Sequence, residues 1–527
     1  RDGTSFTDSP KSIFNFLIND VKFDSFQHVI IYDKDHFKHF TDINNLSSNI
    51  KLVERNTFEY VDALLSAKYL INNSTFNSFF IKKSDQIYVN TWHGTPLKYM
   101  GDAYVQDMVN AQNVRRNFLM ADYILSPNAF TSRVFLEDYK LNELWQGTIL
   151  ENGLPRNDLS QYQTSEEILE RLKIDGLLID ENKPNYIYMP TWQGSDVKDA
   201  KDNSHYLIAL INYINESNDD FNFLIKVHPF LFKELKDNAE LKPYLISNKY
   251  DSNEIFKVTD LLITDYSSVF FDFLVTRRPI LFLHWDSDIY KNDRGSYIAD
   301  SELPGPKLKD LESLKKALYS VSDIQEAYAD AYEKFVAEYV PHEDDKMIQE
   351  YVSAIFEQDY SHIKCVSPTH SKKKILFHAG ALMDNGITSS FLNLINQIDY
   401  DKYDVTIFLH DSKLKEIRDN WARLHPNARK MFKPGLPVYT ISENVHDRML
   451  KNNPFEFDID TYYPKEAYER EARRLFGNAT FDVAVDFSGY SYFWAKYLVA
   501  LDTQVKICYM HNDLFAETNR KVDGVYP

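Results

Sequence analysis

Residues 261–273 read LLITDYSSVFFDF, and this stretch contains the local pattern on which the fold prediction rests. The run LLIT has no polar alternation, which is typical of a strand buried on both faces. Two serines follow the run, and then the apolar spacing of a helix begins. A strand, a polar turn and a helix in this order predict one unit of a parallel α/β sheet, with the turn at the carboxyl end of the strand.

The same unit recurs along the first 340 residues. Apolar runs predict further strands at residues 28–32, 86–89, 123–125, 186–189, 223–227 and 280–283, and helical patterns lie between them, for example at 57–68, 130–139 and 204–215. Distinctive polar turns follow four strands: NTWHGTP (90–96), PTWQG (190–194), HPF (228–230) and DYSS (265–268). Because ligands of open parallel sheets bind at the carboxyl ends of the strands, we expect two Rossmann-like domains that face each other across a cleft.

The character of the chain changes after this region. Residues 342–356 predict a closing amphipathic helix, and the polar segment 357–372 predicts a linker. A strand at 374–377, a Gly-containing turn, a helix at 389–398 and strands at 405–409, 482–486 and 505–509 follow. We therefore expect Rossmann-like domains at 1–155 and 156–356, the linker at 357–372, and a third, incomplete Rossmann-like domain at 373–527.

The composition limits the classes of function. Of 527 residues, 44% are hydrophobic and 26% are charged, as in ordinary globular proteins. A formal net charge of -19 argues against a protein that coats nucleic acid. The 35 Tyr and 36 Phe are better explained by aromatic-rich cores than by sugar-stacking surfaces.

Several features bear on the location of the protein. Cys365 and Cys508 lie far apart and form no metal-binding pair, which is typical of a reducing, cytoplasmic compartment. The start shows no apolar core of a signal peptide, and no apolar run approaches the ~18 residues of a membrane helix. Because the first residue is Arg, we expect a fragment of a longer chain.

Two histidines are candidate catalytic residues. His93 follows a predicted strand, Gly94 allows a sharp turn beside it, and a neutral imidazole can take a proton from a hydroxyl nucleophile. His228 also follows a buried strand, which Pro229 ends, and an imidazole at that position can contact a phosphate. For both residues the alternative interpretation is a packed histidine in a turn.

The turn that follows the strand at 261–264 predicts an anion site. Ser267 and Ser268 add two hydroxyls to the N–H groups of a helix start, a combination suited to phosphate. Simple capping of the helix by Ser267 is the alternative, and the two interpretations do not exclude each other. The sequence contains neither a Walker loop nor a GxGxxG fingerprint, so those nucleotide folds are not expected.

The motifs, taken in order, resemble the CDP-glycerol glycerophosphotransferase family, the polymerases and primases of wall teichoic acid and related capsules. They are NTWHGTPLKYMG (90–101), NGLPRND (152–158), MPTWQG (189–194), VHP (227–229), TDYSSVFFDF (264–273) with RRPILF (277–282), and DRGSYIADSELPGP (293–306). The resemblance covers about residues 1–356, and the opening GTSFTDSPKSIF (3–14) is similar to the start of the family's catalytic region.

The resemblance implies a GT-B fold that transfers glycerol phosphate or ribitol phosphate from a CDP-alditol to a hydroxyl of a growing polymer and releases CMP. It implies that His93 is the general base and that His228 stabilises the donor phosphates. The substrate-binding residues carried over by position are Gly94, Thr95, Arg156, Thr191, Trp192, Thr264, Ser267, Ser268 and Asp272, of which Asp272 binds ribose or shapes the loop. We expect no metal or other cofactor, because no DxD pair stands in a strand-end turn. The implied partners are the CDP-alditol and a lipid-linked or oligosaccharide-phosphate acceptor, with attachment to the inner face of the cell membrane.

The third predicted domain resembles the acceptor-side domain of a second GT-B glycosyltransferase. The resemblance rests on residues 385–387, a Gly turn before a helix, and on DFSGYSYFWA (486–495). The nucleotide-binding half that should follow is absent from the sequence, so we expect no second activity from this chain. His511 is a candidate acceptor contact, and an ordinary loop histidine is the alternative.

Other functions and one departure from the family pattern stay open. The alternative functions are a GT-B nucleotide-sugar glycosyltransferase or epimerase and a polymer-binding scaffold. Gln193 stands where members of the family often have arginine, which leaves the identity of the alditol open. The two arginines at 115–116 and the three lysines at 372–374 are expected to be solvated charges rather than a lipid site. Because donor and polymer are anionic, we expect positive potential near His228, Arg156 and Ser267 within an acidic exterior.

Overall fold

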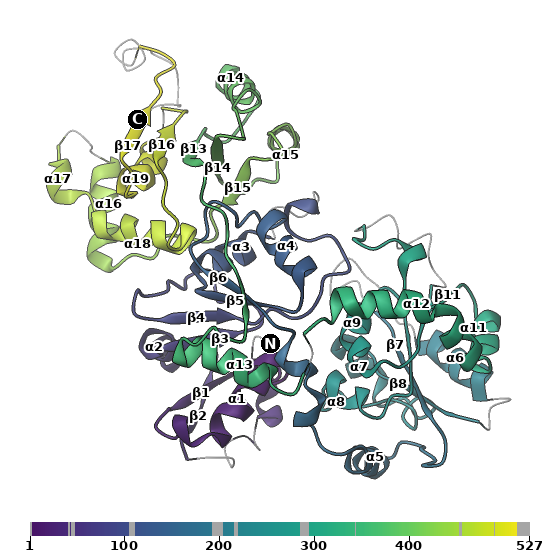
Figure 1. Cartoon of the computed structure of the whole chain (residues 1–527). Helices are drawn as coiled ribbons and strands as arrows, with labels where there is room; N and C mark the ends of the chain where they lie inside the picture. Colours follow the sequence, from purple (N-terminus) through teal and green to yellow (C-terminus); the bar gives the residue numbers. More distant parts are fainter. Residues whose placement is uncertain are drawn as a thin grey trace.

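The computed structural model describes residues 3–40, 43, 48–104, 111–191, 204–215, 220–284, 295–342, 344–452, 456–489 and 491–513. These residues form three five-stranded sheets and one two-stranded sheet, with helices packed around them (Figure 1). Each five-stranded sheet is built largely from parallel strands, as the strand–turn–helix pattern predicts.

The first sheet has the strand order β12-β6-β5-β4-β3. Its strands are β3 (Tyr69–Asn72), β4 (Ile87–Asn90), β5 (Tyr123–Ser126), β6 (Thr148–Glu151) and β12 (Lys364–Val366), and its helices are α2 (Phe58–Ser66), α3 (Ala111–Met120) and α4 (Ala129–Glu137). Strands β3 to β6 are parallel, whereas β12 runs antiparallel to β6. The predicted strand at 28–32 lies outside this sheet, because β1 (His28–Tyr32) pairs with β2 (Ile50–Glu54) as a separate ribbon after α1 (Asp8–Asn19).

The second sheet has the order β11-β10-β9-β7-β8. Its strands are β7 (Asn185–Met189), β8 (Asn222–Ile225), β9 (Leu261–Thr264), β10 (Ile280–Leu283) and β11 (Lys307–Leu308). Its helices are α5 (Ser165–Ile174), α6 (Ser204–Asn215), α7 (Pro229–Leu235), α8 (Ser252–Phe256), α9 (Val269–Phe273), α11 (Leu311–Leu318) and α12 (Val321–Tyr339). Every residue of β8, β9 and β10 is buried, which explains why these strands read as continuous apolar runs.

The third sheet has the order β15-β14-β13-β16-β17 and is parallel throughout. Its strands are β13 (Lys373–His378), β14 (Tyr403–Leu409), β15 (Arg429–Phe432), β16 (Val483–Asp486) and β17 (Val505–Cys508). Its helices are α14 (Gly386–Ile395), α15 (Lys415–Ala422), α16 (Ile441–Asn452), α17 (Ile459–Tyr462), α18 (Lys465–Phe476) and α19 (Tyr492–Ala500).

The segment predicted as a closing helix and a linker returns to the first sheet. Helix α13 (Met347–Val352) and the π-helical turn η11 (Ser353–Glu357) share a hydrophobic core with α1 and with β4, β5 and β6. Strand β12 then adds an antiparallel edge to β6, within the residues expected to be a linker. The first sheet therefore includes an edge strand, β12, that follows all the strands of the second sheet in the sequence.

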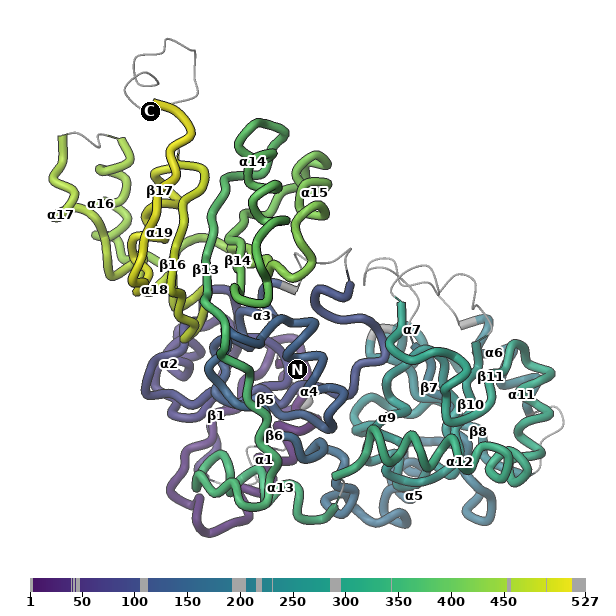
Figure 2. The backbone as a smooth tube through the Cα atoms, turned by 45° about the horizontal axis from the view of Figure 1, so that its top comes forward, coloured from purple at the N-terminus to yellow at the C-terminus, as the bar shows by residue number. Residues whose placement is uncertain are grey.

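The first and third sheets share one continuous core, and both views place the third unit against the first (Figures 1 and 2). Four guanidinium groups at this junction are at least 98% buried: Arg115, Arg116, Arg429 and Arg474. Arg115 donates to Lys430 O, and Arg116 donates to Arg474 O. The expectation that Arg115 and Arg116 are solvated was wrong, because backbone carbonyls of another unit satisfy their donors.

The described residues include no helix that is both long and apolar enough to cross a membrane. Cys365 and Cys508 are both exposed free thiols.

Candidate active site

The turn that carries His93 leaves the carboxyl end of β4 in a strained conformation. Trp92 adopts a φ of 54°, and Gly94 adopts a φ of 127°. Asn90, which is fully buried, accepts a hydrogen bond from the Trp92 N–H and so fixes the start of the turn. The Trp92 ring packs against Phe118 and underlies the His93 ring, with centroids 4.0 Å apart. Non-glycine residues with positive φ cost free energy and occur preferentially at functional sites.

A backbone carbonyl fixes the orientation and the tautomer of His93. Nδ1 lies 3.0 Å from the carbonyl oxygen of Asn73, which follows β3. β3 and β4 are paired in parallel, so the residues after their ends lie side by side. Because a carbonyl can only accept, Nδ1 is the donor, and in the neutral ring Nε2 holds the lone pair. His93 is exposed at the surface of the site, in contrast to the buried residues around it.

Arg156 joins the His93 turn to two distant carboxylates. It lies in η6 (Pro155–Asn157), which follows β6, and it is 9% exposed. Its Nη2 donates to the carbonyl oxygen of His93 at 3.0 Å and to Asp272 Oδ2 at 2.7 Å. Its Nη1 contacts Asp8 Oδ1 at 2.9 Å. Gly94 is required here, since a Cβ at this position would lie 2.8 Å from Arg156 Nη2.

The two carboxylates respond differently to this arginine. Burial raises the pKa of Asp272, and the opposing charge of Arg156 does not fully offset it. The pKa of Asp8 is also pushed up by burial, but Arg156 and hydrogen bonds from Ser9 and Asn73 outweigh burial and leave that pKa below its ordinary value. With one cation between two carboxylates, Arg156 does not supply the surplus positive charge that we expected it to bring to the cleft.

A second group of candidate residues lies at the carboxyl edge of the second sheet. β7 stands between β8 and β9 in the sheet, so the turns that carry Thr191, His228 and Ser267 follow neighbouring strands. Thr191 donates from its N–H at 2.9 Å and from Oγ1 at 2.7 Å to Asp265 Oδ1. Asp265 therefore shapes the Thr191 turn, a role that the sequence did not reveal although this aspartate directly follows a predicted strand.

The hydroxyls of the Thr264 to Ser268 turn have different surroundings. Thr264 is fully buried, and its Oγ1 donates to Met189 O at 2.8 Å. The Ser267 hydroxyl accepts from the Val269 N–H at 3.3 Å, immediately before α9, whose N-cap residue is Ser268 and makes no side-chain capping bond. Asp272 lies four residues after Ser268, one helical turn away on the short helix α9. The Asp272–Arg156 contact thus links the serine turn to the His93 turn.

The remaining candidates are placed as follows. His228 is half-buried at the start of α7, and its carbonyl oxygen accepts from the N–H groups of Leu231 and Phe232. Thr95 is buried, and its Oγ1 accepts from Asn128 Nδ2 at 3.0 Å. Trp192 and Gln193 lie outside the described residues.

A further histidine that the sequence reasoning missed supports the serine turn. His284, which follows β10 and is buried, stacks on the Tyr266 ring with centroids 4.1 Å apart. Its Nε2 also lies 3.3 Å from Asp265 O. The position of His284 directly after the predicted strand at 280–283 could have identified it as a candidate residue.

In the third unit, hydrogen-bonded turns also follow the carboxyl ends of strands of the sheet. Asn385 caps α14 by accepting from the Thr388 N–H at 2.9 Å. Asp486 accepts from the Ser488 and Gly489 N–H groups, at 3.1 and 3.0 Å. His511 is half-buried, and its Nε2 lies 2.6 Å from Phe487 O. Hydrogen bonds within each turn therefore account for the residues of these two motifs without a bound ligand.

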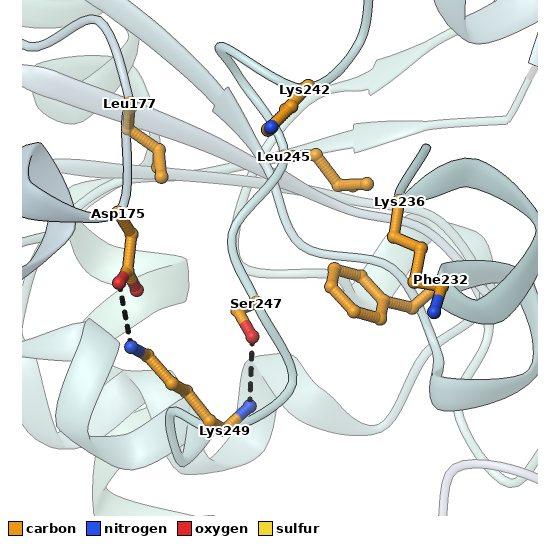
Figure 3. A pocket seen from close by; sticks show the side chains of 8 residues that line it. All are labelled: Asp175, Leu177, Phe232, Lys236, Lys242, Leu245, Ser247 and Lys249. Atoms are coloured by element: carbon orange, nitrogen blue, oxygen red, sulfur yellow. Dashed lines mark hydrogen bonds and ion pairs between the residues drawn. The ribbon is translucent and has the colours of Figure 1, made fainter. Parts of the chain in front are cut away.

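Two cavities among the described residues lie apart from these candidates. The first has a volume of about 190 Å³, and its lining includes the Asp175–Lys249 ion pair, 2.7 Å long, and the Phe232 ring (Figure 3). A second, of about 400 Å³, is lined by Leu159, Ser160, Ser165, Phe256, Lys257, Thr276 and Arg278. Neither is lined by a candidate residue. No group of three or more His, Cys, Asp or Glu residues in the described part of the chain is arranged to hold a metal ion.

Residues 1–357 match the family described as CDP-glycerol:poly(glycerophosphate) glycerophosphotransferase. The chain belongs to this family. The matched region contains the second sheet, the first sheet except for its edge strand β12, and every candidate residue of the first two units, and it ends before the third sheet begins.

Relatives of the chain include polymerases of teichoic acid. A teichoic acid poly(glycerol phosphate) polymerase from Staphylococcus epidermidis is 30% identical over 370 residues, which are 68% of this chain and 49% of that protein. One from Bacillus spizizenii is 30% identical over 336 residues, 62% of this chain and 82% of that protein. The chain thus spans only about half the length of the first of these relatives.

A solved structure confirms the architecture of the family region. The wall teichoic acid polymerase TagF is 27% identical, with a TM-score of 0.58 over 68% of this chain and 86% of that one. The first two units accordingly form the GT-B arrangement of two Rossmann-like domains that the sequence predicted.

Proposed function

We propose that this glycerophosphotransferase family member transfers glycerol phosphate from CDP-glycerol to a hydroxyl of a growing teichoic acid or capsular polymer and releases CMP. The family match and the names of the relatives support the donor and the polymer class. The geometric observation that carries the proposal is the hydrogen bond from His93 Nδ1 to Asn73 O. It leaves Nε2 as the basic nitrogen of an exposed imidazole, which a general base needs.

The proposed reaction is one displacement at phosphorus. The acceptor hydroxyl oxygen attacks the phosphorus that carries glycerol, the phosphoanhydride bond to CMP breaks, and CMP leaves with the bonding electron pair. His93 Nε2 takes the proton of the attacking hydroxyl. Because negative charge grows on the leaving CMP, the site must present donors there.

On the donor side, we assign the phosphate contacts to His228, Ser267 and Ser268. These residues follow β8 and β9, which flank β7, and the parallel register brings their turns to one edge. Thr191 belongs to the turn between them, which Asp265 shapes. We also assign donor binding to Trp192, on the family resemblance alone. Gly94 and Thr95 serve the acceptor side.

The geometry favours structural roles for three of the carried-over residues. Thr264 donates to a backbone carbonyl, so it supports the turn. Arg156 and Asp272 are ion-paired below the His93 turn, so they brace the site, and Asp272 shapes the loop rather than binding ribose.

We further propose that the acceptor is a lipid-linked polymer at the inner face of the cell membrane. Residues 1–155 then form the acceptor-side domain and 156–356 the CDP-alditol domain. Residues 373–527 form the first domain of a second glycosyltransferase, with polar turns at the carboxyl ends of its strands.

The experiment follows CMP release from the full chain with a synthetic lipid-linked acceptor. CDP-glycerol, CDP-ribitol and a UDP-sugar are supplied in separate reactions. We expect CMP from CDP-glycerol only when the acceptor is present. If CMP is released with CDP-ribitol but not with CDP-glycerol, the transferred alditol is ribitol. If only the UDP-sugar is turned over, with release of UDP, the protein is a nucleotide-sugar enzyme. Donor binding without turnover of any donor would favour a polymer-binding scaffold.

A further inference from the structure

His93 and three residues from distant parts of the sequence form a closed ring of contacts. The His93 ring bonds Asn73 O at 3.0 Å, and Asn73 Nδ2 donates to Asp8 Oδ2 at 2.7 Å. Asp8 Oδ1 contacts Arg156 Nη1 at 2.9 Å, and Arg156 Nη2 donates to His93 O at 3.0 Å. Both the ring and the backbone of His93 are therefore held by partners of one carboxylate.

The structure of Asp8 itself is adapted to this position. Its φ of 70° lies in the left-handed region, where an aspartate costs free energy unless its surroundings hold it. Its carboxylate also accepts from the Ser9 N–H at 2.6 Å, so Oδ1 and Oδ2 each have a directed donor. The Asp8 side chain is only 13% exposed, so its charge acts in a poorly solvated setting.

We infer that Asp8 is the positioning residue of His93: it orients the imidazole through Asn73 and Arg156, and its negative charge stabilises the imidazolium that forms when His93 takes the acceptor proton. This inference rests on the proposed role of His93 as general base. It assigns a function to the first residue of α1. The Asp8 carboxylate acts on His93 through Asn73 and Arg156 rather than through a direct hydrogen bond.

The charge balance around His93 gives the inference a measurable consequence. The charged groups around it come from Asp8 at the start of α1, Arg156 in η6 and Asp272 in α9. Asp8 and His93 interact electrostatically, and a nearby negative charge favours the protonated imidazole. Removing the Asp8 charge leaves Arg156 nearby, so the pKa of His93 falls.

The test compares Asp8→Asn with Asp404→Asn in the full chain. Asp404 is a matched control, because it also pairs with a buried arginine, Arg429, at 2.6 Å but lies in the third unit. The first readout is the pH dependence of diethylpyrocarbonate modification of His93, followed by peptide mass spectrometry, which requires no turnover. The second readout is the pH profile of kcat and the KM for CDP-glycerol.

For Asp8→Asn we expect the pKa of His93 to fall by roughly 0.5–1 unit, so that the acid limb of the kcat profile moves to lower pH. We also expect kcat to fall about 10–100-fold, with KM for CDP-glycerol changed less than about twofold. Asp404→Asn should change neither property. An unchanged His93 pKa in a folded Asp8→Asn protein would overturn the inference, because a merely structural role leaves that pKa in place.

Two further outcomes are informative. If Asp8→Asn does not fold, Asn73→Ala keeps every charge and removes only the side-chain link, so kcat should fall several-fold with the pKa of His93 unchanged; an unchanged kcat would overturn the link. If the wild type releases no CMP but Asp8→Asn still shifts the His93 pKa, the proposed function fails while the positioning role stands.

Discussion

The guanidinium of Arg156 donates from a single nitrogen, Nη2, to the backbone carbonyl of His93 at 3.0 Å and to the Asp272 carboxylate at 2.7 Å. The candidate base on the first sheet and the helix that follows the serine turn on the second sheet are thereby tied to one side chain. This contact is one of several that join the two Rossmann-like units, together with Asn128 Nδ2 to Tyr339 O and Ser296 Oγ to Leu97 O.

Replacing Arg156 by methionine should strongly destabilise the family region. The change leaves the Asp8 and Asp272 carboxylates buried without their common cation, and loss of one partner of a buried pair costs about 3–5 kcal/mol. Urea denaturation measures the loss. Lys22→Met is the matched control, because its pair with Glu357 is exposed to solvent and its loss should change the urea midpoint little. Equal midpoints for the two variants would contradict this assignment.

Replacing Gly94 by alanine should lower both stability and CMP release. A Cβ there would lie 2.8 Å from Arg156 Nη2, in a backbone conformation with φ of 127°. We expect a cost of about 1–3 kcal/mol from the conformation, with the displacement of Arg156 added to it. Gly176→Ala separates the two effects, since Gly176 has a φ of 93° but nothing within 4 Å of its Cβ position. If both variants keep full activity, the close approach to Arg156 is unimportant.

Replacing Arg429 by methionine should loosen the third unit from the first. Arg429 donates to the carbonyls of Lys140 and Asn142 in the first unit and pairs with Asp404 in its own. Its loss should cost about 3–5 kcal/mol and increase proteolytic cleavage between the units. Lys402→Met removes a solvent-exposed pair with Asp399 and should have little effect. Unchanged proteolysis of the Arg429 variant would show that the shared core alone holds the units together.

The stability of the first unit should depend on pH through Glu151. Hydrogen bonds from His342, Lys364 and Ser132 outweigh the burial that would raise its pKa, and they lower the pKa from 4.5 to about 2. A carboxyl whose pKa is depressed by folding contributes stability above its unfolded pKa and loses that contribution as the pH falls. Urea midpoints should therefore fall from about pH 4.5 towards pH 2. The Glu151→Gln variant should be less stable near neutral pH and should show a flatter decline; an equally steep decline would rule out Glu151 as its source.

Much of the fold was predictable because its central strands are buried on both faces. LLIT and ILFL are continuous apolar runs, and they became β9 and β10 with the predicted bounds. β15 was missed because its sequence, RKMF, begins with two cations, and only the tertiary contacts of Arg429 make burial of such a strand tolerable. β12 was missed for a related reason: a short polar segment becomes a strand only when it pairs with β6.

The candidate site was predictable to a smaller extent. The parallel register brings strand-end turns together, so the grouping of Thr191, His228 and Ser267 followed from the pattern alone. The ring of Asp8, Asn73, His93 and Arg156 did not, because its members are separated by 20 to 148 residues and no spacing rule relates them. The sequence pointed to His93 and Arg156 separately, and the structure shows what connects them.

The central claim is that His93 is the base in transfer of glycerol phosphate from CDP-glycerol. The direct measurement is the rate of acceptor-dependent CMP release by His93→Ala, together with its affinity for CDP-glycerol by calorimetry. We predict a loss of about 10²–10⁴-fold in rate, the usual contribution of general base catalysis, with a donor Kd within a few-fold of the wild type. Release of CMP at the wild-type rate by His93→Ala would contradict the account.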